Sequence, residues 1–302
     1  GFSPKKPTQS SSDAEWSKTT AHLGLRFVAG YAGPGLKVRD VIERGPASHA
    51  KSRIRAGEIV TAIDAKPVDP DMDPTSVLNG SLERDIQLRV LSADGKERDV
   101  TLRPISYAAA RALLYEALVK RNRAAVEKAS AGMLGYLHIQ LMNMASFYRF
   151  EHELYDAAAG KEGLVIDVRE NRGGSTTDHL LTALTQPVHA VTVPRDGTPG
   201  YPQDRRVYAT WSKPIVVLCN QNSFSNAEIF SHAVKALGRG KLVGTPTAGA
   251  VISTGATSIM DLGTLRLPYR GWFLAETGQD MELNGAKPDF VLWPKPCEIP
   301  HG

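Results

Sequence analysis

The chain has 302 residues, of which 42% are hydrophobic and 23% are charged, a balance typical of globular proteins large enough for two domains of ordinary size. The net charge is only +4, and the basic residues are scattered without interleaved aromatic side chains, so we expect no nucleic-acid partner. No apolar run reaches the ~18–20 residues of a membrane span, and two distant cysteines make neither a disulfide framework nor a metal site.

The first half of the chain contains three predicted parts. Residues 1–16 are rich in Ser, Lys, Pro and Thr, which predicts a flexible leader. Residues 17–104 contain short alternating or apolar runs separated by Gly and Pro turn signals, which is typical of a small β-rich domain. Residues 105–131 place apolar side chains at helical spacing, and we expect a linking helix there.

From residue 132 to residue 302 strand-like and helix-like runs alternate, which indicates an α/β layer fold. The apolar run 214–219 (PIVVLC) predicts a buried parallel strand, and 227–237 predicts an amphipathic helix that ends at Gly238. The polar turn between them (220–226, NQNSFSN) lies where open α/β sheets place ligands and nucleophiles. Taken alone, however, Ser223 or Ser225 would more often be a helix cap.

A second polar turn follows the apolar run 163–168 and contains Gly173 and Gly174. Parallel strands end at the same edge of a sheet, so these glycines should lie near Ser225. Adjacent glycines allow backbone N–H groups to point inward, as an oxyanion hole requires, although a tight turn is the preferred explanation for the glycines taken alone. In combination, the two turns predict a serine nucleophile that faces backbone donors.

The β-rich part resembles a PDZ domain in the segments 22–27 (HLGLRF), 41–50 (VIERGPASHA) and 54–68 (IRAGEIVTAIDAKPV). The first segment is similar to the loop and strand that hold a peptide's terminal carboxylate. The resemblance therefore implies substrate contacts at Leu23, Gly24 and Leu25, with the peptide added to a sheet edge. A spacer domain with an occluded edge is an equally open alternative.

Five later segments resemble, in order, the catalytic domain shared by tail-specific (carboxyl-terminal processing) proteases and the tricorn protease core. They are 135–139 (GYLHI), 164–174 (LVIDVRENRGG), 220–230 (NQNSFSNAEIF), 237–247 (LGRGKLVGTPT) and 281–289 (MELNGAKPD). The resemblance implies a crotonase-like (ClpP/crotonase) α/β protease core over 132–302, preceded by the small β-rich PDZ domain and the linking helix. It implies no metal and no cofactor.

Carried over residue by residue, the resemblance implies that Ser225 is the nucleophile and that the N–H groups of Asn226 and Gly174 are the oxyanion donors. It implies a supporting carboxylate at Glu282, 57 positions after the serine. The lysine base of tail-specific proteases would fall at Ala250, which excludes a Ser–Lys dyad unless Lys241 or Lys287 reaches the site by another route.

The tricorn branch takes its base, a histidine next to a second serine, from a segment upstream of the PDZ domain. None of the eight histidines of this chain is a convincing substitute. We therefore expect an upstream segment or a companion chain to supply the Ser-His pair, and little or no turnover from this chain alone. Asp196 aligns with a tricorn acid proposed to favour a basic residue before the scissile bond, although a surface aspartate is the commoner explanation.

These patterns predict a tricorn-type serine peptidase that acts on peptides or unfolded proteins, with a second copy of the chain as a further candidate partner and no membrane partner. Two alternatives stay open. The first is a catalytically inactive peptide-binding module, and the second is a crotonase-like acyl-thioester enzyme, for which the sequence marks no adenine-nucleotide pocket. Tricorn-type relatives suggest a cytoplasmic location, and tail-specific relatives a periplasmic one; we expect the cytoplasm.

Overall fold

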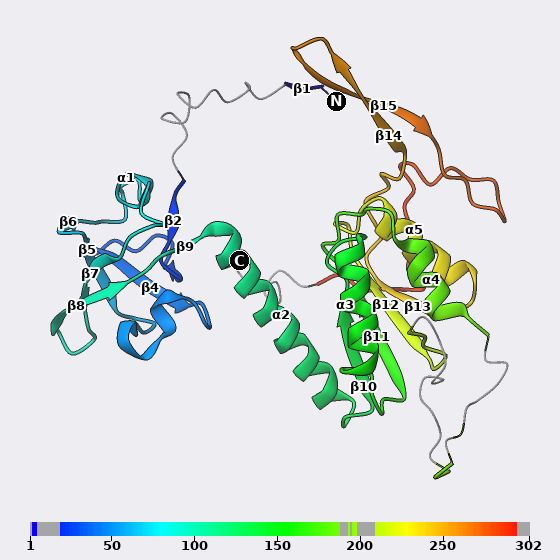
Figure 1. The fold of residues 1–302 in the computed structure, drawn as a ribbon, viewed down its shortest axis with the longest axis horizontal. Coiled ribbons are helices and arrows are strands. Elements are labelled where there is room, and N and C mark those ends of the chain that lie inside the picture. Colours follow the sequence, from blue (N-terminus) through cyan, green and yellow to red (C-terminus); the bar gives the residue numbers. More distant parts are fainter. Residues whose placement is uncertain (1, 5–18, 188–192, 194, 198–208, 295–302) are drawn as a thin grey trace. The chain divides into compact units, whose positions relative to one another are not determined.

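The computed structural model describes residues 2–4, 19–187, 193, 195–197 and 209–294 (Figure 1). The chain divides into two compact units, one formed by residues 7–120 and the other by residues 1–6 and 121–302. Most of the leader predicted over 1–16 lies outside the described residues. Within it, β1 (Phe2–Pro4) is a strand paired antiparallel with β15 (Gly263–Arg270), so these three residues are not the flexible chain that composition suggested.

The smaller unit is built on an antiparallel sheet whose strands follow the order β3-β4-β5-β7-β8, with β6 paired to β5. Alternation explains how the sheet packs: in β7, Ile86, Leu88 and Val90 are buried while Gln87 and Arg89 face outward. The strands are β3 (Leu25–Phe27), β4 (Leu36–Val41), β5 (Ile59–Ile63), β6 (Lys66–Pro67), β7 (Ile86–Leu91) and β8 (Glu97–Leu102). A separate pair joins β2 (Ala21–His22) to β9 (Ile105–Ser106), and this unit also contains the short helix α1 (Thr75–Leu78).

A single long helix, α2 (Tyr107–Ala129), follows β9 and occupies the stretch where the linking helix was predicted. Its last residues belong to the larger unit.

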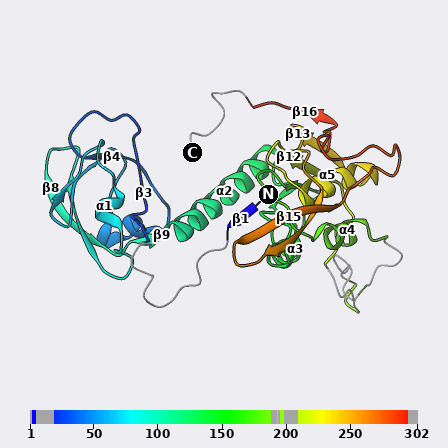
Figure 2. The ribbon, with the colours of Figure 1, turned by 90° about the horizontal axis from the view of Figure 1, so that it is seen from above.

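The larger unit contains a five-stranded sheet in the order β10-β11-β12-β13-β16, and every pair in it is parallel. Its strands are β10 (Leu134–His138), β11 (Gly163–Asp167), β12 (Ile215–Cys219), β13 (Lys241–Gly244) and β16 (Phe290–Val291). The helices between them are α3 (Met144–Tyr155), α4 (Thr177–Thr185) and α5 (Asn226–Ala236). Helix α5 contacts β12, β13 and α4 (Figure 2). This arrangement confirms the predicted mixed α/β fold and buries one core around Ile166, Val217 and Phe230.

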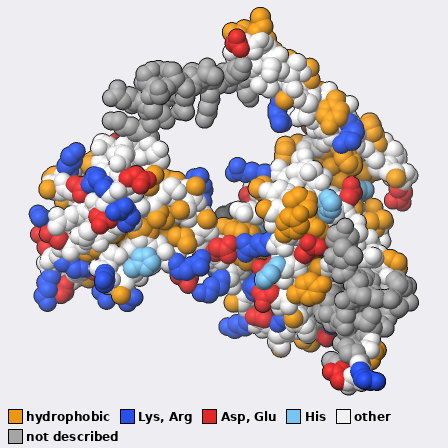
Figure 3. All heavy atoms as spheres, viewed as in Figure 1, with side chains coloured by type: hydrophobic (Ala, Val, Ile, Leu, Met, Phe, Trp, Pro, Cys, Tyr) orange, Lys and Arg blue, Asp and Glu red, His pale blue; other side chains and the backbone are white. Residues whose placement is uncertain are grey.

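An antiparallel hairpin extends from this unit and is drawn in orange in Figure 1. It consists of β14 (Ser253–Ile259) and β15, which pair from end to end, and β1 lies on the other edge of β15. The hairpin turns at residues 260–262, between the two strands. Apolar side chains on and beside it are exposed, among them Met260, Leu262 and Tyr269 (Figure 3).

Backbone and guanidinium contacts join the two ends of the segment 185–210. The Trp211 N–H donates to the Ala183 carbonyl at 2.9 Å. The Arg239 guanidinium donates to the Leu184 carbonyl and, at 2.8 Å in each case, to the carbonyls of Trp211 and Lys213. The two ends of this segment are thus fixed to each other at the edge of the core. Among the helices of the described ranges, none combines the length and the apolar character needed to cross a membrane.

Candidate active site

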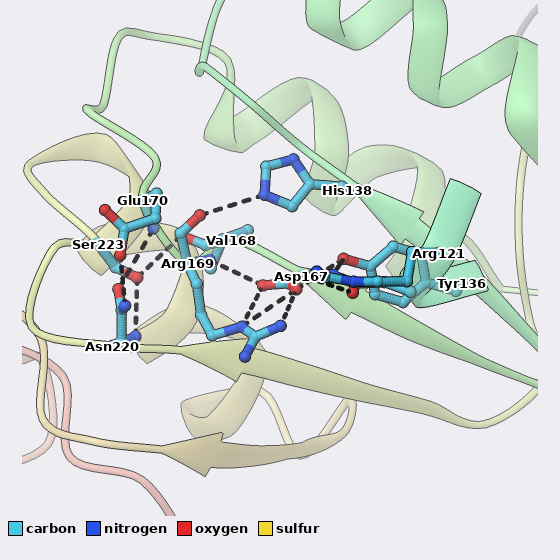
Figure 4. Close-up of polar contacts among 10 residues, drawn as sticks. Arg121, Tyr136, His138, Asp167, Val168, Arg169, Glu170, Asn220 and Ser223 are labelled. Atoms are coloured by element: carbon cyan, nitrogen blue, oxygen red, sulfur yellow. Dashed lines mark hydrogen bonds and ion pairs between the residues drawn. The ribbon is translucent and has the colours of Figure 1, made fainter. Parts of the chain in front are cut away.

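The turn between β12 and α5 holds Ser225 in an unusual backbone conformation. Ser225 is the N-cap residue of α5, with φ 55° and ψ −117°, a region that residues other than glycine rarely adopt. A serine on a strained strand-to-helix turn is the arrangement found at the nucleophiles of α/β hydrolases. The other serine of the turn, Ser223, is fully buried, donates its hydroxyl proton to the Val168 carbonyl at 2.8 Å and accepts from the Asn220 N–H at 3.0 Å (Figure 4). Ser223 therefore stabilises the turn, and Ser225 is the half-buried serine.

Of the glycine pair, Gly173 lies directly against Ser225, and Gly174 lies against Met142. Gly173 has φ 82°, and a Cβ atom added to it would lie 2.7 Å from the Ser225 Cβ and 2.7 Å from the Phe224 carbonyl oxygen. Gly174 has φ 146°, and its added Cβ would lie 1.9 Å from the Met142 carbonyl oxygen. Only glycine fits at these two positions, because both the backbone angles and the available space exclude a side chain.

Asn226, the first residue of α5, is hydrogen-bonded to Thr177, the first residue of α4. Its Oδ1 accepts from the Thr177 N–H at 3.0 Å, and its carbonyl accepts from the Thr177 hydroxyl at 2.8 Å. Within the described residues, neither the Asn226 N–H nor the Gly174 N–H has a hydrogen-bond acceptor. The Asn226 N–H lies next to Ser225 at the positive end of α5, and the Gly174 N–H follows Gly173, which contacts Ser225. Free backbone donors of this kind can stabilise a developing oxyanion.

Glu228 is the member of this site that sequence reasoning missed. Its carboxylate is fully buried and accepts four hydrogen bonds: from the Ser225 N–H (2.8 Å), the Thr247 hydroxyl (2.6 Å), the Gly249 N–H (2.5 Å) and the Ala250 N–H (3.0 Å). The signal was present, because Ser225 and Glu228 form the Ser-x-x-Glu pattern of a capping box.

Glu282 is half-buried and accepts hydrogen bonds from the two residues that follow Ala250. Its Oε2 accepts from the Val251 N–H at 2.8 Å and from the Ile252 N–H at 2.9 Å. Its Oε1 has no hydrogen-bond partner within the described ranges. Among the described residues, hydrogen bonds link Glu282 to Ser225 indirectly, through residues 249–252 and Glu228.

A charged network lies at the carboxyl end of β11 (Figure 4). Buried Asp167 accepts from the Tyr136 hydroxyl at 2.7 Å and from the Arg169 guanidinium at 2.5 Å. Burial, followed by the charge of Asp167, raises the pKa of Tyr136. The exposed carboxylate of Glu170 accepts from the Asn220 side chain at 2.8 Å, which ties the turn after β11 to the turn after β12. These contacts fix the shape of the sheet edge on which Ser225 lies.

The described histidines do not hydrogen-bond Ser225. His138, predicted to lie within a strand, is the last residue of β10, and its Nε2 is 3.2 Å from the Arg169 carbonyl oxygen (Figure 4). Burial lowers its pKa. The ring of His179 lies 5.3 Å from that of Phe147. His189 and His301 lie outside the described residues. The ranges that the structure covers contain no group of three or more His, Cys, Asp or Glu side chains able to hold a metal ion.

The remaining candidates lie away from this turn. Leu23 and Leu25 are buried in the smaller unit, the Gly24 N–H donates to His22 Nδ1 at 2.9 Å, and β3 is an edge strand of its sheet. A peptide added to this edge would therefore contact backbone rather than the two leucine side chains. Asp196 is exposed, and only its immediate neighbours Arg195 and Gly197 are described around it.

Two family models match the chain. Peptidase family S41 matches residues 133–292, and the tricorn protease PDZ domain matches residues 37–107. The chain belongs to peptidase family S41. The predicted resemblance to tricorn and tail-specific proteases, with a PDZ domain in front of the catalytic region, is thereby confirmed.

This S41 chain is also similar to several known proteins. Tricorn protease homolog 1 of Streptomyces coelicolor is 34% identical over 256 residues, which are 84% of this chain and 23% of that protein. The tricorn protease homolog of Saccharolobus solfataricus is 30% identical, with the same coverage. The crystal structure of the tricorn protease matches with a TM-score of 0.72 at 26% identity, over 91% of this chain and 27% of that one. The S41 chain thus spans about a quarter of the length of these relatives.

Proposed function

We propose that this chain carries the nucleophile and the oxyanion hole of a tricorn-type serine peptidase with a crotonase-like catalytic core. The observation that carries the proposal is the strained conformation of Ser225 at the start of α5, in contact with Gly173. Two N–H groups without acceptors in the described part of the chain, on Gly174 and Asn226, support it.

In this reaction the Ser225 Oγ attacks the carbonyl carbon of a peptide bond and its proton passes to the base. The Gly174 and Asn226 N–H groups stabilise the negative charge that develops on the carbonyl oxygen. When the intermediate collapses, the C–N bond breaks and the leaving amine takes the proton back from the base. A water molecule, deprotonated by the same base, then releases the acyl group from Ser225.

An upstream segment or a companion chain supplies the base in this proposal, as a Ser-His pair. Glu282 supports that pair through Oε1, since its other oxygen already accepts from the backbone of Val251 and Ile252. Peptide or unfolded-protein substrates dock by strand addition at β3, against the backbone of Leu23, Gly24 and Leu25. Asp196 favours substrates with a basic residue before the scissile bond, and the protein acts in the cytoplasm, alone or together with further copies of itself.

The alternative is a peptide-binding module without catalytic activity. One observation favours it: no histidine in the described residues hydrogen-bonds Ser225. The two functions differ in whether Ser225 becomes reactive when the upstream segment is present.

A fluorophosphonate probe separates these functions. We expect it to label Ser225 in a protein that joins this chain to the upstream segment, and we expect Ser225→Ala to abolish both labelling and peptide turnover. The control is Ser258→Ala, which removes an exposed hydroxyl on β14 and should change neither. Labelling that persists in Ser225→Ala, or turnover that survives it, would refute the assignment. Robust turnover by the 302-residue chain alone would refute the externally supplied base.

A further inference from the structure

Four consecutive backbone N–H groups, those of residues 249–252, donate to two carboxylates. The Gly249 and Ala250 N–H groups donate to Glu228, at 2.5 and 3.0 Å. The Val251 and Ile252 N–H groups donate to Glu282, at 2.8 and 2.9 Å. This stretch lies between β13 and β14 and is neither helix nor strand, so the two carboxylates replace the hydrogen bonds that regular structure would provide.

Of the two carboxylates, only Glu228 also contacts the backbone of Ser225. It accepts from the Ser225 N–H at 2.8 Å and from the Thr247 hydroxyl at 2.6 Å, and none of its surface is exposed. Hydrogen bonds to an ionised carboxylate are stronger than those between neutral groups, and shielding from water strengthens them further. The buried charge is satisfied only while all four donors stay in place.

Close backbone packing holds the loop that carries Glu282 against the same segment. The Thr247 Oγ1 accepts from the Ala286 N–H at 2.7 Å. A Cβ atom added to Gly249 would lie 2.9 Å from the Leu283 carbonyl carbon, and one added to Gly285 would lie 2.7 Å from the Thr247 Oγ1. Segment 247–252 is therefore enclosed between α5 on one side and loop 281–286 on the other.

We infer that Glu228 is a positioning residue: its carboxylate keeps Ser225 in its strained backbone conformation and fixes segment 247–252 at a set distance from the nucleophile. The effect of Glu228 on catalysis rests on the proposed function of Ser225 as the nucleophile. The strain at Ser225 persists because its N–H is tied to a carboxylate that three other donors hold in place. Without that carboxylate the Ser225 backbone relaxes, and the hydroxyl moves relative to the Gly174 and Asn226 N–H groups.

The first test measures hydrogen exchange and does not require activity. In the 302-residue chain, Glu228→Gln replaces one acceptor oxygen by an NH₂ group that faces N–H donors. We expect the amides of Gly249 and Ala250 to exchange about 10–100-fold faster, because they lose hydrogen bonds to a charged group. Amides of β11 and β12 should keep their rates. Glu276→Gln, which changes an exposed glutamate in the same unit, is the control and should leave every rate unchanged.

Unchanged exchange at Gly249 and Ala250 in Glu228→Gln would overturn the inference. If that variant does not fold, Thr247→Val and Thr247→Ser take its place. Valine removes the hydroxyl that Glu228 accepts from and should speed exchange at both amides, whereas serine keeps the hydroxyl and should restore protection. Equal rates in the valine and serine variants would likewise overturn the inference.

The second test uses the protein that includes the upstream segment. With rates normalised to the fraction of Ser225 that the fluorophosphonate labels, Glu228→Gln should lower kcat by about 10–100-fold and leave KM within about twofold. A purely structural role would lower the labelled fraction while leaving the normalised kcat unchanged, and that result would refute positioning. If wild-type Ser225 stays unlabelled, the proposed function fails, while the exchange measurements still decide whether Glu228 holds the segment.

Discussion

At the scale of single residues, the space around Ser225 is set by a glycine that cannot be replaced. A Cβ on Gly173 would lie 2.7 Å from both the Phe224 carbonyl oxygen and the Ser225 Cβ, and its φ of 82° adds strain. Gly160 has a similar φ of 69° but no heavy atom within 4 Å of an added Cβ. Replacement by alanine therefore imposes an unfavourable backbone angle at both positions. Only at Gly173 does the added Cβ also clash with neighbouring atoms.

We predict that Gly173→Ala lowers the free energy of unfolding by about 2–4 kcal/mol and abolishes fluorophosphonate labelling of Ser225. Gly160→Ala should cost about 1 kcal/mol and leave labelling intact. Urea denaturation followed by circular dichroism, with labelling under native conditions, tests both. Equal losses of stability in the two variants would show that backbone angle, and not contact with Ser225, determines the effect.

His138 makes the folding stability of the larger unit depend on pH. Burial, the largest contribution, lowers its pKa; the charge of Asp167 and the hydrogen bond with the Arg169 carbonyl raise it, and the charges of Arg169 and Arg149 lower it. Because the folded pKa lies below the ordinary value of 6.5, the unfolded chain takes up the proton first as the pH falls. The contribution of neutral His138 to the stability of the folded state is complete above about pH 6.5. This contribution is lost as the pH falls through the pKa of His138 in the folded protein.

We therefore predict a lower urea midpoint at pH 5 than at pH 7.5, and a smaller difference between the two in His138→Gln. His22 and His232, whose pKa values are also lowered mainly by burial, should account for part of the dependence that remains. An identical pH dependence in wild type and His138→Gln would contradict the contribution assigned to His138.

The sequence predicted the position of Ser225 next to the glycine pair because both follow apolar runs that read as parallel strands. It did not predict what Glu228 and Glu282 contact. Both carboxylates accept hydrogen bonds from N–H groups of residues 249–252, a stretch without periodicity, and such contacts depend on how the loops fold over α5. For Glu228 a capping box supplied a local signal; for Glu282 only the family resemblance pointed to a role.

At the scale of elements, β12 is the central strand of the parallel sheet, with β11 and β13 on its two sides. Cys219 ends this strand, is fully buried, and donates its S–H to the Thr245 carbonyl at 3.4 Å. Burial, followed by the charge of Asp167, raises the pKa of its thiol to about 12. Cys219 is thus a small residue of the core, while Cys297 lies outside the described residues.

We predict that Cys219 does not react with iodoacetamide at pH 8 in the folded protein, because the reactive thiolate is scarce and the sulfur is enclosed. The experiment uses Cys297→Ser, so that one thiol remains. Alkylation should become fast only in urea concentrations that unfold the chain. Fast alkylation under native conditions would show that β12 is accessible at its carboxyl end.

Secondary structure was largely predictable at this scale, since apolar runs marked β10, β11, β12 and β13 and helical spacing marked α2 and α5. Pairing between distant segments was not. Phe2–Pro4 pairs with residues of β15 near the other end of the chain, and a composition rich in Ser, Lys and Pro gave no sign of a strand. A strand this short forms only where a free sheet edge accepts it, and no local pattern contains that information.

At the scale of the whole molecule, each unit has a core of its own. In the smaller unit the buried residues include Leu23, Val60, Ile63, Leu88 and Val90. In the larger unit they surround the parallel sheet. Separate cores allow each unit to fold without the other.

We predict that a fragment of residues 19–106 folds alone and unfolds cooperatively. Leu88→Ala should destabilise it by about 2–5 kcal/mol, because it leaves a cavity in the core, whereas Gln87→Ala on the outer face of β7 should change its stability by at most about 0.5 kcal/mol. Thermal unfolding and the dispersion of amide NMR signals test this. A fragment without dispersed signals would show that the smaller unit depends on the larger one.

The Arg239 contacts also bear on how such a protein can change over evolution. Arg239 and the Trp211 N–H fix the two ends of segment 185–210 to one another. Lengthening a loop whose ends are already joined costs little, about 0.6 kcal/mol for each doubling. Insertions or deletions between these two ends should therefore leave α4 and β12 in place. The substrate preference proposed for Asp196 would then change in evolution independently of the chemistry proposed for Ser225.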